Sequence, residues 1–353
     1  MTIYTRIVQQ IGSSILISLP IEWVKKNSII KGKSIIIETN IDNTISIYNN
    51  YQEEEIKIVF EWDKEPNTIN YSNKESDPKE NNDKVTKSIL NKIFGAYLLG
   101  YNRINVHSKV QISYENSEAI KKATRKLIGL EIVDENSFDI CFQFLLDAKT
   151  LNIGKILAMM NSIIQGMFRE TIHSLSGELS NDLAKKIASR DDEIDRQYFL
   201  LVRIIRTAIM NKRLASSMNL TNIDMLDYRI AANFLETAGD LIAELVTYLN
   251  ELKEVKQVAM LIKKIGDSLS EMQYYSVEAF ISTSRDKAFK VIENYEDFKN
   301  TIAQLKKNIT SNHDAQNDET FSIALINSIS CLDKIAKCWI DISDLAKPTY
   351  ILK

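Results

Sequence analysis

The chain has little glycine, proline or cysteine. Its 353 residues include 10 glycines, 4 prolines and 3 cysteines. So few chain-breaking residues favour long helices joined by few tight turns. The cysteines, Cys141, Cys331 and Cys338, are odd in number and lack the spacing of a metal site, which indicates free thiols in a reducing compartment.

Long apolar runs are also missing. Because no stretch reaches about 18 consecutive apolar residues, no transmembrane helix is expected. The residues after Met1 lack the basic and apolar regions of a secretory signal, so a cytoplasmic protein is expected. A net charge of −3 argues against a protein that is coated with nucleic acid, although one small DNA-contacting module is compatible with it. The length allows two or three domains.

Residues 1–50 predict two strands, a short helix and two further strands. Gly12-Ser13-Ser14 has the composition of a turn, and Pro20 stands at the favoured first position of a helix. A module this small, with open strand edges, is not expected to be stable alone. Dimerisation would cover those edges. The expected strands are 3–10, 14–19, 34–38 and 44–48.

Four short motifs in this module occur together. Arg6–Ser14 has the pattern R-x-V-Q-x-x-G-x-S, and Ser18-Leu19-Pro20, Glu22-Trp23 and Lys31-Gly32-Lys33 follow it. Over about the first 48 residues the sequence resembles the swapped-hairpin module of the AbrB/SpoVT family. In that family two chains interlace their strands into one small barrel that docks on DNA.

The resemblance implies a homodimer formed through residues 1–50, with a half-barrel from each chain. It also implies phosphate contacts from basic side chains, since backbone phosphates dominate DNA affinity. Three acidic residues offset most of this basic charge, so a module that dimerises without binding DNA is the alternative. The candidate DNA-binding residues are Arg6, Lys25, Lys26, Lys31 and Lys33.

The next part of the chain predicts a linker and a small α/β segment. Residues 51–83 contain a candidate strand near 55–60 and then a polar, charged stretch that is typical of a linker. Residues 84–149 alternate helical and strand patterns. His107 is expected at the end of a strand rather than in a metal site.

From residue 150 onward the sequence predicts helices alone. The pattern repeats after three helices, which predicts two antiparallel three-helix bundles, over residues 150–252 and 253–353. The fold class is therefore mainly α, with a β module at the N-terminus. The expected helices are 150–177, 180–212, 224–250, 254–283, 286–310 and 319–346.

Pairs of carboxylates stand one turn apart on two helices of the first repeat. Asp191 and Asp195 are four residues apart, as are Glu236 and Asp240, so each pair shares one helix face. Both pairs lie on or beside apolar stripes, where an unpaired charge is costly. With oxygen donors and no nearby Cys or His, they predict a divalent or trivalent ion such as Mg, Ca, Mn or Fe.

The second repeat keeps part of this pattern. Glu293 and Asp297 occupy the place of the first pair, and Asp333 that of Glu236. Lys337 replaces the last carboxylate, and its ammonium group is expected to pair with one of these acids. We therefore expect a second site that binds metal weakly or not at all.

The PhoU family of phosphate-signalling regulators has two three-helix bundles that each carry E/D-x-x-x-D on two helices. Over about residues 150–346 this chain resembles that family, with the last of the four motifs altered by Lys337. Together with the N-terminal module, the chain is similar to archaeal-type PhoU-domain regulators. The resemblance implies a non-enzymatic regulator of phosphate uptake or homeostasis. Its expected partners are phosphate transporters or signalling proteins.

Two other functions are compatible with these residues. The chain could be a helical scaffold whose acids are neutralised by Arg190, Arg196 or Arg203 on the same helix. It could also be a di-metal carboxylate enzyme, although such sites add Glu-x-x-His ligands. His173 and His313 lie in other surroundings, so we expect no enzyme.

Overall fold

The structure is a computed structural model that describes residues 3–39, 43–49, 56–62, 78–176, 181–249, 252, 256–311 and 319–346. It divides into two compact units, Met1–Glu54 and Glu55–Lys353, which are described separately below. Within the described ranges no helix is both long and apolar enough to cross a membrane.

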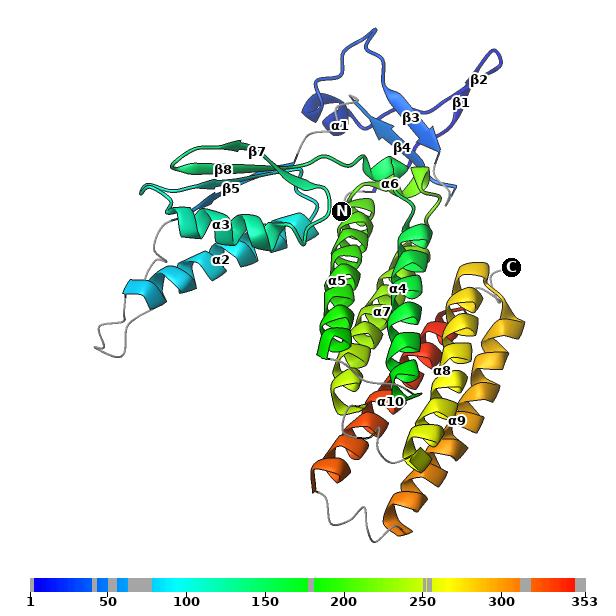
Figure 1. Cartoon of the computed structure of the whole chain (residues 1–353). Coiled ribbons are helices and arrows are strands. Elements are labelled where there is room, and N and C mark those ends of the chain that lie inside the picture. The colour runs from blue at the N-terminus through cyan, green and yellow to red at the C-terminus, as the bar shows by residue number, and fades with distance from the viewer. Residues whose placement is uncertain are drawn as a thin grey trace, which may run out of the picture. The chain divides into compact units, whose positions relative to one another are not determined.

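The smaller unit has the predicted order of elements (Figure 1). Strand β1 (Gln9–Ile11) pairs antiparallel with β2 (Ser14–Leu16), and Gly12 supplies the positive φ of 61° that the turn between them requires. Helix α1 (Ile21–Lys26) starts directly after Pro20, which is its N-cap residue. Strand β3 (Ile36–Thr39) pairs antiparallel with β4 (Ile45–Tyr48).

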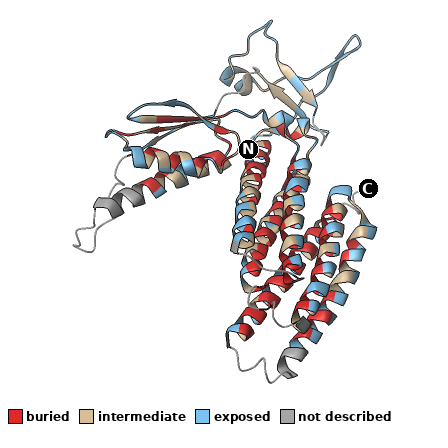
Figure 2. Ribbon diagram, in the orientation of Figure 1, coloured by how far each residue is buried: buried red, intermediate tan, exposed pale blue. Residues whose placement is uncertain are grey.

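The described residues of this unit include no buried side chain (Figure 2). Large apolar groups face solvent instead; Ile7 is 86% exposed and Ile15 is 75% exposed. Two short hairpins and one six-residue helix cannot enclose these groups. The unit thus presents an uncovered apolar surface in addition to the open strand edges that led us to expect a dimer, and the dimer and the half-barrel stay predictions.

The larger unit begins with a mixed sheet, which among the described residues has four strands in the order β5-β6-β8-β7. Strand β5 runs parallel to β6, and the other two neighbouring pairs are antiparallel. Helix α2 connects β5 to β6, and α3 connects β6 to β7. The bounds are β5 (Lys57–Glu61), α2 (Pro78–Leu98), β6 (Arg103–His107), α3 (Tyr114–Thr124), β7 (Leu130–Glu135) and β8 (Asp139–Phe144).

The candidate strand near 55–60 is present as β5, but the first turns of α2 lie in the polar stretch that was predicted as a linker. Both elements belong to the same layer as the segment predicted at 84–149. Strand β5 is held by its pairing with β6, which starts 46 residues further along the chain. No local sequence pattern shows that these two strands pair. The rest of the predicted linker, residues 63–77, lies outside the described residues.

The predicted long helices are present, with ends within a few residues of those expected. Helices α4, α5 and α7 pack on one another, as do α8, α9 and α10. Helix α7 also packs on α10 and α4 on α8, so one apolar core runs through both groups (Figure 2). The short α6 was not predicted. The bounds are α4 (Ile153–His173), α5 (Asn181–Met210), α6 (Lys212–Ser217), α7 (Asn222–Leu249), α8 (Lys256–Ser282), α9 (Arg285–Ser311) and α10 (Glu319–Leu345).

Arg203 joins the sheet layer to helix α5. This side chain is 3% exposed and donates hydrogen bonds to the carbonyl oxygens of Tyr97, at 2.6 Å, and Gly100, at 3.4 Å. Its guanidinium carbon lies 3.9 Å from the centre of the Phe144 ring. Arg203 therefore faces the sheet layer, so its predicted role as a neutralising partner for the carboxylates is wrong.

Candidate metal centre

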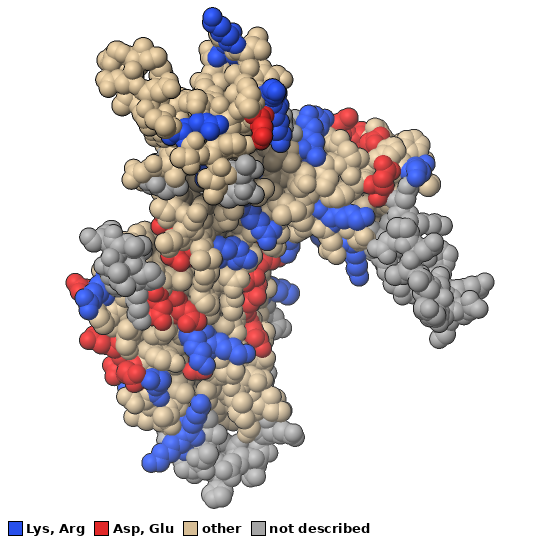
Figure 3. All heavy atoms as spheres, turned by 180° about the vertical axis from the view of Figure 1, so that it is seen from behind, with Lys and Arg blue, Asp and Glu red and all other residues tan. Residues whose placement is uncertain are grey.

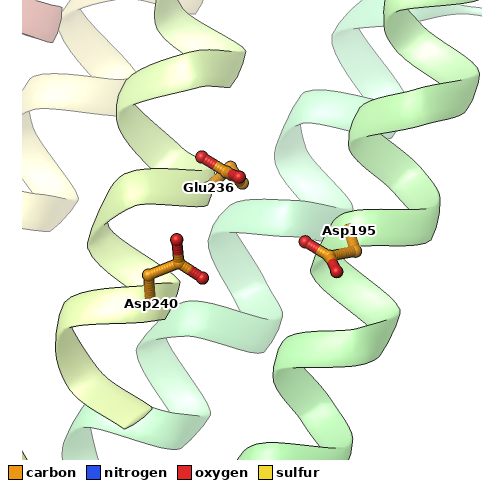
Figure 4. Close-up of side chains that lie close together, drawn as sticks. All are labelled: Asp195, Glu236 and Asp240. Carbon is orange, nitrogen blue, oxygen red and sulfur yellow. The ribbon is translucent and has the colours of Figure 1, made fainter. Parts of the chain in front are cut away.

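Carboxylates from α5 and α7 meet where these two helices pack together. One ligand oxygen from each of Asp195, Glu236 and Asp240 lies within 4.8 Å of the others. Figure 4 shows Asp195 pointing from α5 toward α7, where Glu236 and Asp240 project one turn apart. Their i, i+4 spacing puts the two α7 side chains on one face, and the packing of α5 on α7 supplies the third.

Asp191 lies one turn before Asp195 and packs against the backbone of α7 at Gly239. A Cβ atom added to Gly239 would lie 3.1 Å from an oxygen of Asp191 and 2.8 Å from a methyl carbon of Ile194. The missing side chain of Gly239 therefore allows the two helices to approach and brings a fourth carboxylate to the cluster. The four predicted ligands of the first site are thus adjacent.

Burial and mutual repulsion make these acids hard to ionise together. Burial raises the pKa of Asp191 to about 7, and the neighbouring charges of Asp240 and Asp195 add to the shift. Burial likewise raises the pKa values of Asp195 and Glu236, with a further contribution from Asp240. A cation placed among the carboxylates would relieve this repulsion.

Lysine and arginine side chains near the cluster offset only part of the repulsion between the carboxylates. The ammonium nitrogen of Lys126 lies 2.6 Å from an oxygen of Asp192 and 3.7 Å from one of Asp195. Arg229 lowers the pKa of Glu236, but its effect is smaller than that of burial. No basic side chain is among the groups that shift the pKa of Asp191, which burial and the neighbouring acids raise to about 7.

The two remaining arginines of α5 that could neutralise the acids have other partners. Arg190 lies 2.8 Å from Glu170 of α4, and Arg196 lies 2.7 Å from Glu193 one turn earlier. These ion pairs are partly exposed. The two guanidinium groups therefore pair with other acids and not with the carboxylate cluster, to which the scaffold hypothesis assigned them.

The donor set suits a hard metal ion. All of its ligand atoms are carboxylate oxygens, which Mg, Ca, Mn and Fe accept readily, whereas structural zinc prefers Cys and His. The close packing of α5 on α7 at Gly239 places Asp191 beside these donors. Asp195, Glu236 and Asp240 would hold such an ion, with Asp191 as the fourth donor.

The second predicted site looks different. Glu293 and Asp297 are exposed on α9, and Asp333 of α10 lies 2.7 Å from the ammonium nitrogen of Lys337. This ion pair is one of those predicted for Lys337. In the part of the chain that the structure describes, the cluster on α5 and α7 is the one group of three metal-binding side chains that meet closely. Glu293, Asp297 and Asp333 form no such group.

The predicted DNA-binding side chains all face solvent in the smaller unit. The ammonium nitrogen of Lys33 lies 3.5 Å from the carbonyl oxygen of Ser28, and the guanidinium group of Arg6 lies 5.4 Å from the centre of the Tyr4 ring. In contrast to this smaller unit, the helical part of the larger unit shows basic and acidic side chains intermixed on the face seen in Figure 3. The exposed candidates of the smaller unit are Arg6, Lys25, Lys26, Lys31 and Lys33.

Sequence reasoning missed Lys126 at the candidate metal centre. It follows α3 and precedes β7, 66 residues before Asp192 in the chain. No periodicity or motif links these positions, since their proximity depends on how the sheet layer packs on α5.

Comparisons with known proteins match part of the helical region to one domain family. Residues 157–249, which contain all four carboxylates of the first site, match the family model of the PhoU domain. Among solved structures, the chain is similar to PhoU from Pseudomonas aeruginosa, with a TM-score of 0.49 and 16% sequence identity over 55% of this chain and 93% of that one. No curated protein matches.

Proposed function

We propose that this protein is a PhoU-like, non-enzymatic regulator of phosphate uptake or phosphate homeostasis. The observation that carries the proposal is the coincidence of two findings within residues 157–249. This range matches the PhoU domain, and it holds the three meeting carboxylates Asp195, Glu236 and Asp240. In this proposal the helical part is a metal-binding sensor made of two three-helix bundles.

The N-terminal unit would make the regulator a dimer. Its exposed isoleucines and unpaired strand edges support a swapped-hairpin half-barrel that a second copy completes. The exposed Arg6, Lys25, Lys26, Lys31 and Lys33 would then contact DNA phosphates. The sensor would act in the cytoplasm on phosphate transporters or signalling proteins.

Metal analysis tests the sensor. We expect protein purified without chelator to carry a divalent or trivalent ion, and Glu236→Gln and Asp240→Asn to lose most of it. Glu293→Gln and Asp297→Asn remove exposed carboxylates of the second repeat and are the controls, which should retain the wild-type content. A wild-type chain without metal, or equal losses in all four variants, would contradict a site on α5 and α7.

Phosphate response tests the regulatory role. A strain that lacks this gene should show altered phosphate uptake, which the wild-type gene restores and Glu236→Gln does not. If the wild-type gene and the Glu236→Gln gene both restore phosphate uptake, regulation does not require the metal site. No effect of the deletion on phosphate uptake would contradict the proposed function.

Sedimentation and DNA retention test the N-terminal unit. The wild-type chain should be a dimer, and Ile15→Asp should dissociate it because a charge then replaces a buried apolar contact. Lys25→Gln with Lys26→Gln should weaken DNA retention and flatten its salt dependence, whereas Lys122→Gln in the larger unit should change neither. Retention that is independent of salt would argue against phosphate contacts.

The scaffold hypothesis is the second candidate, and one observation favours it. Lys126 already lies 3.7 Å from Asp195, so part of the acidic charge is paired without metal. A scaffold would contain no metal and would tolerate Asp191→Asn and Glu236→Gln. A di-metal enzyme would instead consume oxygen when loaded with iron.

A further inference from the structure

A second candidate site lies in a cavity of about 470 Å³ at the helix ends of the larger unit. Its wall includes the start of α4, the early turns of α7 and the C-terminal end of α8. Along α7 it is separated from the carboxylate cluster, because Asp227 precedes Glu236 by nine residues, or about 14 Å of helix. This volume falls in the range of small-molecule pockets.

Asp227 is a largely buried acid in the cavity wall. The residue is 9% exposed, and no basic group is among the causes that shift its pKa. Burial is the main cause that raises its pKa, and the nearby charge of Asp224 raises it further. A buried carboxylate without a counter-ion is costly, so a positive group from a ligand would stabilise it.

Asp224 differs because it has a structural role. One of its oxygens accepts hydrogen bonds from the backbone nitrogen of Thr221, at 2.8 Å, and from the Thr221 hydroxyl, at 2.7 Å. The Thr221 hydroxyl in turn accepts from the backbone nitrogen of Asp224. These reciprocal bonds form a capping box at the start of α7 and account for Asp224. Nothing comparable accounts for Asp227.

Two aromatic rings beside Asp227 give the cavity an apolar wall. Tyr228 and Phe280 both line it, and their ring centres lie 5.0 Å apart in an edge-to-face arrangement. Aromatic faces attract ammonium and guanidinium groups and also pack well on methylene chains. A carboxylate next to aromatic rings can therefore bind an organic cation, with the carboxylate contacting the charge and the rings contacting the carbon chain.

Helix ends of both polarities lie at the cavity wall. Helices α6 and α8 are each followed there by a residue of positive φ, Asn219 at 56° and Thr283 at 50°, and present the negative end of the helix dipole. Helices α4 and α7 begin at the same wall and present the positive end, so the helix dipoles offset one another and the charge of Asp227 decides the sign. Lys149 also lines the cavity, but it is not among the groups that shift the pKa of Asp227.

We propose that this cavity binds a small organic cation, whose ammonium or guanidinium group pairs with Asp227 and whose carbon chain packs on Tyr228 and Phe280. A metal ion fits less well. Among the described residues, Asp224 and Asp227 belong to no group of three metal-binding side chains, and one oxygen of Asp224 is already engaged. The ligand would thus be an effector of the helical domain at a place separate from the carboxylate cluster.

Thermal unfolding of the full-length chain with defined probes tests the proposal. Agmatine, which carries an ammonium and a guanidinium group, should raise the Tm by at least about 2 °C at millimolar concentration. Butane-1,4-diol has a similar chain without charge and should leave the Tm unchanged. Asp227→Asn should abolish the response to agmatine, and Phe280→Leu should weaken it several-fold in a calorimetric titration.

Two comparisons keep the test decisive. Asp227→Asn removes a buried charge, so the variant should fold with a Tm no lower than wild type. Glu236→Gln alters the metal site and should keep the agmatine response, which separates this proposal from the proposed function. Three results would overturn the proposal of an organic-cation site. Asp227→Asn could show the same rise in Tm with agmatine as wild type, or butane-1,4-diol could raise the Tm as much as agmatine. The third is a rise in Tm with Mg²⁺ alone that agmatine does not reproduce.

Discussion

The ammonium nitrogen of Lys126 lies 3.7 Å from a carboxylate oxygen of Asp195. Lys126 belongs to the sheet layer and Asp195 to helix α5, so this contact brings a charge from the sheet layer to the candidate metal centre. A lysine at this distance competes with a metal ion for the same carboxylate.

Lys126→Gln should therefore strengthen metal binding. Both partners are partly exposed, at 43% and 28%, so we expect about 0.5–1 kcal/mol, or a two- to fivefold lower Kd. Lys122→Gln, an exposed lysine close by in the chain, is the control and should leave the Kd unchanged. Competition titration with a metal indicator measures the effect. Weaker binding in Lys126→Gln would mean that the lysine holds Asp195 in its binding position.

The stability of the metal-free protein should fall as the pH rises from about 4 to 7. The pKa of Asp191 is about 7 in the folded chain and 3.8 in the reference state, so the folded chain binds the proton more tightly in this window. Stability falls with pH wherever the folded state holds more protons. Urea unfolding at pH 5, 6 and 7 should show the decline, and Asp191→Asn should flatten it.

Glu293→Gln, at the equivalent but exposed position of α9, is the control for this titration and should keep the wild-type slope. Metal binding should show the opposite trend and become tighter over the same range, because carboxylates bind metal in the deprotonated form. A metal-free chain whose stability rises from pH 5 to 7 would contradict the assignment of Asp191.

Gly239→Ala should destabilise the chain and weaken metal binding. The new methyl group would meet Ile194 at 2.8 Å and Asp191 at 3.1 Å, which forces α5 away from α7 or moves both side chains. Overpacking costs about 1–3 kcal/mol, partly offset by the better helix propensity of alanine. Gly95→Ala is the matched control, since nothing lies within 4 Å of its added Cβ, and it should stabilise by about 0.5–1 kcal/mol. Urea unfolding of both variants provides the comparison.

Arg203→Lys should lower the free energy of unfolding by about 2 kcal/mol. The planar guanidinium group donates to two carbonyl oxygens and lies over the Phe144 ring, and one ammonium group cannot make all of these contacts. Arg206→Lys, on the exposed side of the same helix, should have almost no effect. Amide exchange should show the loss first in the sheet layer, because Arg203 joins that layer to α5.

The mainly helical class and the small N-terminal β unit were predictable because both depend on local patterns. Apolar residues at helical spacing locate the long helices to within a few residues, and turn residues locate the hairpins of the smaller unit. A strand near 55–60 was predicted, but its pairing with β6 was not, because that pairing is non-local. For the same reason the helix periodicity could not reveal that Lys126 reaches Asp195.

The sequence by itself determined which carboxylates share a helix face, since i, i+4 spacing fixes that geometry within one helix. The tertiary structure decided which of these faces meet another helix. Asp191 and Asp195 are half-buried against α7, whereas Glu293 and Asp297, with the same spacing, face solvent on α9. Helix packing brings Glu236 and Asp240 to Asp195 and raises its pKa by burial, and no pattern within a single helix encodes that proximity.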